Sequence, residues 1–380
     1  MTRVAVLLAH AQDPVVWRER HARGETLDAT PYGYELAAAQ LDLAWAVSAH
    51  ESRLARAVRS RLFRALGFDL VHAWRNRRML FEADVIWTHT EREHLAVALL
   101  QRLRRPGGRR KVPVVAQTVW LWDEWEGLSA ARRRLVGWLL GSHDVEAVHS
   151  HLNLADSLRH VPGRRVVQIP FGSASVPQGA AADAGADGLA VPAPDGRPLV
   201  LAVGNDAHRD WRALRDAARQ LPEVAFHVAS KSRRAVGLDW PANVVVGATG
   251  SLVELSGLYR RADAVVVPLT PNRHVSGSTA CIEALGARRP LVVTRVGGIE
   301  EYVAGEARTV EHGDVAGLAA ALRDAVAGRV PAPSGDAVRA RGLTQRDYVQ
   351  RYVLLTRMLV GDTPWSSDVS RFAPVPDGRS

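Results

Sequence analysis

Hydrophobic residues in the first half of the chain gather in short runs that alternate with amphipathic stretches. Residues 4–8, 85–87 and 112–117 are such runs. Short apolar runs separated by helical periodicity are typical of a parallel sheet covered by helices. From the same kind of pattern we expect a helix over residues 35–49 and a strand over residues 70–73.

The second half repeats this alternation with the same spacing. Each apolar run is short enough for a buried strand, and each is followed by a stretch with helical periodicity. The expected strands span residues 199–203, 224–229, 244–246, 264–269 and 291–293, and the expected helices span residues 211–220, 252–261 and 315–326.

The two series predict an α/β fold with two Rossmann-like domains that face a central cleft, the natural place for a ligand. Between the series, residues 173–197 consist mainly of Ala, Gly, Pro and Asp. That composition indicates a linker or surface loop. The expected parts are an N-terminal domain (1–172), the loop (173–197), a C-terminal domain (198–343), a helix that packs back toward the N-terminal domain (344–362) and a tail (363–380).

Two turns of small residues lie on either side of the expected strand 291–293, each at the start of a helix. The first is Ser276-Gly277-Ser278-Thr279 and the second is Gly297-Gly298. Backbone N–H groups at a helix start attract anions, and a diphosphate fits two such turns. Glu283 lies roughly 7 to 8 Å further along the helix axis, where a carboxylate could hold ribose hydroxyls. The alternative is a buried helix with a serine N-cap and a solvent-facing glutamate.

Two basic residues follow expected strands at the same edge of the second sheet. Arg209 opens a helix after the strand 199–203, and Lys231, one of only two lysines in the chain, closes the strand 224–229. Both suit a phosphate. Alternatively, Arg209 forms an ion pair with Asp206 or Asp210, and the position of Lys231 has no functional meaning.

Together these residues resemble the donor-binding domain of GT-B glycosyltransferases, in particular family 4 and its exopolysaccharide-type group 1 transferases. The resemblance rests on Ser276–Thr279, Glu283-Ala284, the stretch 286–293 and Gly297-Gly298, and it covers residues 145–360. It implies that Glu283 holds the ribose of a nucleotide sugar. It also implies that Ser278, Thr279, Arg209 and Lys231 meet the diphosphate.

The chain departs from the family pattern at one position. The family normally carries a second glutamate eight positions before Glu283, in contact with the donor sugar, and here that residue is Val275. We expect His274 to take its place. We expect neither a metal nor a cofactor, because cations and helix N-termini can neutralise the leaving diphosphate and the sequence contains no Asp-x-Asp pair.

The expected acceptor side is the N-terminal domain. His89 and Asp123 are candidates for a general base, which an inverting reaction would need, although each is by itself more often a core or surface residue. His10 and Gly33 are expected to line the cleft on the acceptor side.

Charge and composition add a possible surface partner. The 380-residue chain carries a formal charge of +9, and about seven of these units fall in residues 1–165. The arginine clusters there are explained most simply as solvated helix faces. Among specific partners they favour an anionic membrane surface, because Trp74, Trp138 and Phe81 lie beside them. No nucleic-acid module is recognisable.

Cysteine usage and the first residues favour the cytoplasm. The single cysteine excludes an internal disulfide. The apolar run at the start is too short for a signal peptide or a membrane span.

The sequence therefore predicts a cytoplasmic hexosyltransferase, peripheral on the inner face of the plasma membrane. It would move a sugar from a nucleotide-sugar donor to a hydroxyl of a lipid-linked or polysaccharide acceptor, with retention expected from the resemblance. A non-hydrolysing sugar-nucleotide epimerase and a non-catalytic scaffold of the same fold remain alternatives. A Rossmann dehydrogenase is disfavoured, because no Gly-x-Gly-x-x-Gly follows a first strand.

Overall fold

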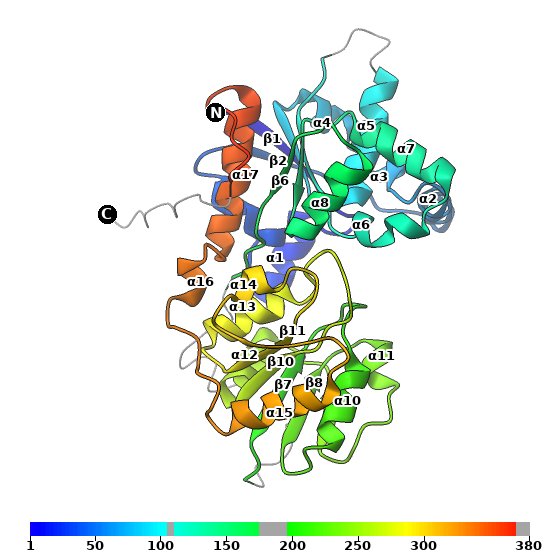
Figure 1. Cartoon of the computed structure of the whole chain (residues 1–380). Coiled ribbons are helices and arrows are strands. Elements are labelled where there is room, and N and C mark those ends of the chain that lie inside the picture. Colours follow the sequence, from blue (N-terminus) through cyan, green and yellow to red (C-terminus); the bar gives the residue numbers. More distant parts are fainter. Residues whose placement is uncertain (105–109, 175–195, 370–380) are drawn as a thin grey trace. The chain divides into compact units, whose positions relative to one another are not determined.

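The chain forms two α/β units, each built on its own six-stranded parallel sheet (Figure 1). This description rests on a computed structural model and covers residues 1–104, 110–174 and 196–369. The first unit comprises residues 1–20, 28–170 and 345–380, and the second comprises residues 21–27 and 171–344. The two Rossmann-like domains predicted from the sequence are confirmed, while most of the expected linker and tail lies outside the described residues.

The sheet of the first unit has the strand order β2-β1-β3-β4-β5-β6, with every neighbouring pair parallel. Strands β3, β4 and β5 are buried along their whole length, because helices cover both faces of the sheet. The strands are β1 (Arg3–Leu7), β2 (Asp42–Trp45), β3 (Val85–Thr88), β4 (Val114–Gln117), β5 (Val145–Val148) and β6 (Val166–Gln168).

One face of this sheet packs on a core that includes side chains of α3, α4, α5 and α7. The C-terminal helix α17 packs on the other face, where the Trp87 indole N–H donates to Thr356 Oγ1 at 2.8 Å. The helices of the unit are α1 (Pro14–Ala22), η1 (Pro31–Ala37), α2 (Arg53–Leu66), α3 (Leu70–Arg75), α4 (Arg77–Glu82), α5 (Glu91–Arg104), α6 (Leu121–Glu124), η3 (Trp125–Gly127), α7 (Ala130–Leu140), α8 (His151–His160) and α17 (Gln345–Val360).

Two sequence-based predictions are wrong in this unit. The expected helix over residues 35–49 is instead the 3-10 helix η1 followed by strand β2, because residues 42–45 pair with the edge strand β1. The expected strand over residues 70–73 is helix α3, whose first turn is capped by the Asp69 carboxylate accepting from the His72 N–H at 3.0 Å. A short apolar run is compatible with either a strand or a helix. Here the Asp69 N-cap favours the helix.

The second unit has the strand order β12-β11-β10-β7-β8-β9, again wholly parallel. Helices α10 and α15 pack on one face of its sheet, and α12, α13, α14 and α16 pack on the other. The strands are β7 (Leu199–Val203), β8 (Ala225–Ala229), β9 (Val244–Gly247), β10 (Ala264–Val267), β11 (Leu291–Thr294) and β12 (Arg308–Val310); the helices are α10 (Trp211–Arg219), α11 (Arg233–Val236), α12 (Leu252–Arg261), α13 (Ser278–Gly286), α14 (Glu300–Val303), α15 (Val315–Val326) and α16 (Ala337–Ala340).

The strand order gives the second sheet a topological switch point. From β7 the chain moves outward through β8 and β9, and it then returns to the other side of β7 to form β10. The loops that leave β7 and β10 therefore diverge at a topological switch point. In open parallel sheets, ligands bind outside the carboxyl ends of the strands at such a point.

Candidate donor site

The loops that follow β7 and β10 are joined to one another by backbone hydrogen bonds. The Asp210 N–H donates to the Pro268 carbonyl at 3.0 Å, and the Thr270 N–H donates to the His208 carbonyl at 2.9 Å. These two contacts fix the side chains of both loops in one arrangement at the carboxyl edge of the sheet.

Arg209 joins the two loops through its side chain. The residue is 7% exposed, and its guanidinium donates from Nη1 to Ser276 Oγ at 2.8 Å and from Nε to the Val203 carbonyl at 3.2 Å. Gly204, at φ +149°, lies directly under the guanidinium, and a Cβ atom there would clash with it. Burial lowers the pKa of Arg209, and the nearby Asp206 carboxylate opposes that effect.

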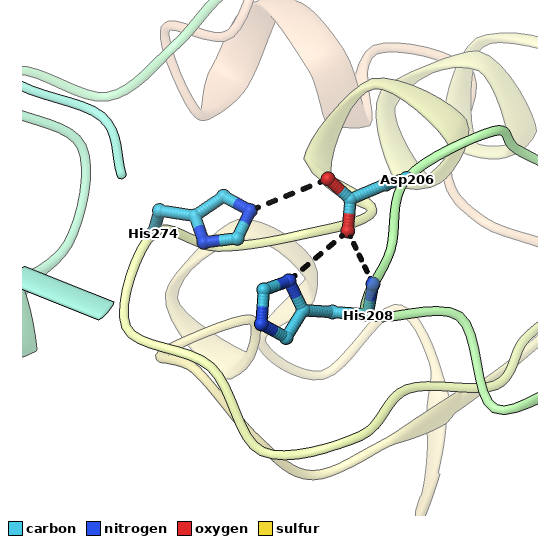
Figure 2. A group of neighbouring side chains, drawn as sticks. All are labelled: Asp206, His208 and His274. Carbon is cyan, nitrogen blue, oxygen red and sulfur yellow. Dashed lines mark hydrogen bonds and ion pairs between the residues drawn. The ribbon is translucent and has the colours of Figure 1, made fainter. Parts of the chain in front are cut away.

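Asp206 lies at the centre of a polar cluster that the sequence analysis missed (Figure 2). Its Oδ1 accepts from Ser276 Oγ at 2.7 Å and from the His208 N–H at 2.8 Å, and its Oδ2 lies 3.5 Å from His274 Nε2. Burial alone would raise the pKa of Asp206, but the hydrogen bonds from His274 and Ser276 hold it well below its usual range. The carboxylate is therefore ionised at neutral pH.

Val275 occupies the position at which the resemblance places an acidic residue, and His274 precedes it. Val275 has a φ of +57° and is 1% exposed, with its side chain in the core of the second unit. A β-branched residue in the left-handed region is strained, and such strain persists only where the surroundings enforce it. The turn thereby directs the apolar side chain into the core and the His274 imidazole toward Asp206.

Helix α13 begins at this turn and carries the predicted carboxylate. Gly277 caps the helix at φ +92°, Ser278 is half-buried and Thr279 is exposed. Glu283 is 9% exposed and accepts from the Tyr259 hydroxyl at 2.7 Å. Burial raises the pKa of Glu283 to about 7, although Tyr259 and Arg209 oppose the shift.

The remaining predicted donor residues lie on the adjacent loops of the same edge. The Lys231 N–H donates to Asn205 Oδ1 at 2.6 Å, and the lysine itself is exposed. Gly297, at φ +70°, leaves no room for a Cβ beside Asn272, whose Oδ1 accepts from the Ser276 N–H at 3.0 Å. Gly298 is also left-handed, at φ +79°. The second unit therefore assembles its predicted residues around one edge, with Arg209 and Ser276 in direct contact.

His89, a predicted base in the first unit, is a buried residue at the end of β3. Its Nδ1 lies 3.1 Å from the Tyr34 hydroxyl and 3.2 Å from Gln117 Nε2, and its ring stacks on Tyr32 at 3.3 Å between centroids. Burial lowers the pKa of His89 well below its ordinary value, and His149 adds to this effect. Because the amide N–H of Gln117 can only donate, Nδ1 is an acceptor and the ring is neutral with its proton on Nε2.

The other predicted acceptor-side residues occupy separate positions in the first unit. Gly33, at φ +65°, lies between the two tyrosines that contact His89, and a Cβ there would clash with Gln345. His10 lies 3.3 Å from the Ala49 carbonyl through Nε2 and contacts the ring of His72. Asp123 is half-buried on the short helix α6. Their roles toward an acceptor stay predictions.

Several residues at the second unit's edge were not predicted as site residues. Asp206 and His208 lie in the stretch Gly204–Trp211, which the sequence analysis used only for Arg209. The side chains of Asn272 and Tyr259 fix Ser276 and Glu283, respectively. The sequence does show polar residues shortly after β7 and after β10. That they contact one another can be inferred only once β7 and β10 are known to be neighbouring strands.

Two Rossmann-like units, the second with the buried Arg209 beside a helix N-terminus at its switch point, form the architecture of the GT-B fold. Residues 197–327 match the family model described as Glycosyl transferases group 1. The chain therefore has the GT-B fold, and its second unit contains the domain that matches the Glycosyl transferases group 1 model.

Solved structures of low sequence identity share this fold. Sucrose-phosphate synthase from Thermosynechococcus elongatus is 19% identical with a TM-score of 0.70, over 96% of this chain and 100% of that one. UDP-forming trehalose-phosphate synthase from Burkholderia xenovorans is 14% identical (TM-score 0.64; 95% and 100%). HepE from Anabaena, in complex with UDP and glucose, is 14% identical (TM-score 0.63; 93% and 99%). No curated protein matches the sequence.

Proposed function

We propose that this protein transfers a hexosyl group from a UDP-sugar to a hydroxyl of a lipid-linked or polysaccharide acceptor, as a family 4 enzyme of the exopolysaccharide type. The observation that carries the proposal is the contact between Arg209 and Ser276 at the start of α13, with Glu283 further along the helix. The choice of UDP is supported by two neighbours of the same fold, one crystallised with UDP and one described as UDP-forming.

The chain's own charges can neutralise the leaving diphosphate. Arg209 is fixed by two hydrogen bonds and needs no reorganisation to meet a phosphate, and the N-terminus of α13 adds a favourable dipole. Lys231 lies on the next loop, after β8. We propose that these groups do the work that a metal ion does in other transferases, so that turnover requires neither a metal nor a cofactor.

The donor sugar would lie near His274 rather than near a carboxylate. Asp206 fixes this imidazole through Nε2, so the ring is held at the edge where the donor would bind. Retention of configuration agrees with the state of His89. A neutral imidazole whose proton is on Nε2 can donate a hydrogen bond to a sugar, whereas its acceptor nitrogen is occupied by Tyr34 and Gln117.

Calorimetric titration with UDP, GDP and ADP tests the donor site. We expect UDP to bind best, and Lys231→Met to weaken binding by about tenfold, since a charge-assisted contact contributes about 1.5 kcal/mol. Lys111→Met is the matched control, because the only other lysine pairs with Asp144 in the first unit. An equal loss of UDP affinity in both variants would show that Lys231 does not contact the donor, and no binding of any nucleotide would favour the non-catalytic scaffold.

Treatment with EDTA tests metal independence. Turnover abolished by EDTA would contradict it.

The first unit exposes apolar side chains among arginines, which supports a peripheral membrane location. Leu54, Val58 and Leu62 form an i, i+4, i+8 stripe on α2 and are 81%, 57% and 39% exposed. Helix α2 carries five arginines and no acidic residue. Trp74, 53% exposed, lies under the Arg77 guanidinium at 4.3 Å. No helix among the described residues is long and apolar enough to cross a bilayer.

Basic amphipathic helices bind the interface of anionic membranes through both charge and apolar burial. We propose that the stripe on α2 does so on the inner face of the plasma membrane, which brings the first unit to a lipid-linked acceptor. Co-sedimentation with phosphatidylglycerol vesicles should be salt-sensitive and should fall several-fold in the double variant Val58→Ser, Leu62→Ser. Val236→Ser, at an exposed valine of the second unit, is the control. Equal binding to neutral phosphatidylcholine vesicles, or none to either, would contradict the proposal.

A further inference from the structure

Asp206, His208 and His274 lie together in a way that a sugar-transfer site does not require. Each offers one ligand atom, and the three atoms lie within 4.8 Å of one another. Figure 2 shows the carboxylate facing both imidazoles. Its Oδ1 lies 3.4 Å from His208 Nδ1 and its Oδ2 lies 3.5 Å from His274 Nε2. Two imidazoles and a carboxylate are a ligand set typical of zinc and related divalent transition ions.

The spacing fits one shared ion. Zinc binds imidazole nitrogen and carboxylate oxygen at about 2.0 to 2.2 Å, so two ligand atoms of a tetrahedral site lie about 3.4 Å apart. Asp206 Oδ1 lies 3.4 Å from His208 Nδ1 and Asp206 Oδ2 lies 3.5 Å from His274 Nε2, both close to this value. Because the three ligand atoms lie within 4.8 Å of one another, a small rotation of the side chains would place one carboxylate oxygen and both nitrogens around one ion. The Nδ1 atom of His208 is buried, faces Asp206 and makes no hydrogen bond to any residue of the described ranges.

The surrounding contacts hold the ligands in place. The Asp206 carboxylate is oriented by Ser276 Oγ and by the His208 N–H, as the carboxylate ligands of metal sites commonly are. The ligands come from two loops that are hydrogen-bonded to each other. The set is therefore arranged before any ion arrives, which reduces the entropy lost on binding.

We propose that Asp206, His208 and His274 form a binding site for a single Zn²⁺ ion or a similar divalent transition ion. The ion is not needed for the proposed transfer, in which Arg209 and Lys231 meet the diphosphate. It acts on that reaction as an inhibitor, because it takes the carboxylate that orients His274. Zinc thereby controls donor use at an edge where the enzyme otherwise needs no metal.

Titration of the chelator-treated full chain with ZnCl₂, and separately with CoCl₂, tests the site. We expect one ion per chain, and for cobalt the intense visible absorption of a four-coordinate complex with nitrogen and oxygen ligands. His208→Asn should weaken zinc binding by more than about tenfold, since one of three protein ligands is lost. His208 is partly exposed, so this variant should fold, and circular dichroism would verify it.

His312→Asn is the matched control, because His312 lies at the same edge and its Nδ1 is 3.7 Å from Asp210, outside the cluster. It should bind zinc as the unaltered chain does. Equal weakening in both variants, or no binding of either ion at millimolar concentration, would overturn the proposal. UDP titration of the chelator-treated chain measures the donor site separately, so loss of one function leaves the other open to measurement.

Discussion

Glu283 connects stability to function at the scale of a single residue. Its carboxyl is buried against Tyr259 and its pKa is raised to about 7, whereas an unfolded glutamate titrates near 4.5. The folded state therefore binds the proton more tightly. The contribution of Glu283 to stability is greatest below about pH 4.5 and falls as the pH rises to about 7, because the charge must then remain buried. The difference corresponds to about 3 kcal/mol at most.

Replacement of Glu283 by glutamine should separate these two effects. The amide oxygen still accepts from Tyr259 but never ionises, so the melting temperature should rise at pH 8 and change little at pH 5. UDP affinity should fall at pH 8, since an amide is a weaker acceptor for ribose hydroxyls. Thermal melts and calorimetry at both pH values would measure this, with the exposed Glu223→Gln as control. A lower melting temperature at pH 8 would contradict the account.

Gly204 sets a steric limit beside the predicted phosphate contact. Its left-handed φ and the guanidinium above it leave no space for a methyl group. Gly204→Ala should cost about 1 to 3 kcal/mol of stability and displace Arg209, with a UDP affinity at least about tenfold lower. Gly250→Ala is a suitable control, since a Cβ there would meet only the flexible end of Glu254. Unchanged UDP binding in Gly204→Ala would show that Arg209 does not contact the donor.

At the scale of elements, the hydrophobic pattern alone predicted the strands that are buried on both faces. The bounds of β7 and α15 agree with the predicted ranges to the residue. The pattern failed for residues 35–49, where alanines favour a helix in isolation but pairing with β1 makes β2 instead. It also could not find the Asp206 cluster, because neighbouring strands in the sheet are far apart in the chain.

The caps of α10 and α15 allow a matched test within one unit. Asp210 accepts from the Ala213 N–H at 3.0 Å, and Asp314 accepts from the Gly317 N–H at 2.8 Å. Replacement of either by alanine should cost about 1 kcal/mol, visible as a lower melting temperature. Asp210→Ala should also weaken UDP binding, because the cap follows Arg209 directly. A similar loss of UDP affinity in Asp314→Ala would show that the weaker binding results from lower overall stability of the unit.

At the scale of the whole molecule, the last described helix belongs to the first unit although the second unit precedes it in the chain. Helix α17 supplies Tyr352, whose ring contacts Trp87 and whose hydroxyl donates to the Thr88 carbonyl at 3.1 Å. Removal of this helix would expose that face of the first sheet. The second unit has its own sheet and two core clusters and contains the whole predicted donor site.

A chain that ends at Thr344 should therefore lose the cooperative melting of the first unit and keep its UDP binding. A chain that ends at residue 369 is the control and should behave as the full chain does. Calorimetry of both, with and without UDP, would measure this, since a ligand at 100 times its Kd raises the stability of the unit that binds it by about 2.7 kcal/mol. Loss of UDP binding together with α17 would contradict the independence of the second unit.

The two hydrogen bonds that join the loops after β7 and β10 have a consequence for dynamics. The Asp210 and Thr270 amides are already engaged before any donor arrives. They should exchange their protons with deuterated solvent slowly in the free protein, and UDP should change their rates little. Exchange should slow instead at amides near the first turn of α13. Most of the conformational entropy of this edge is thus lost when the chain folds rather than when its substrate binds.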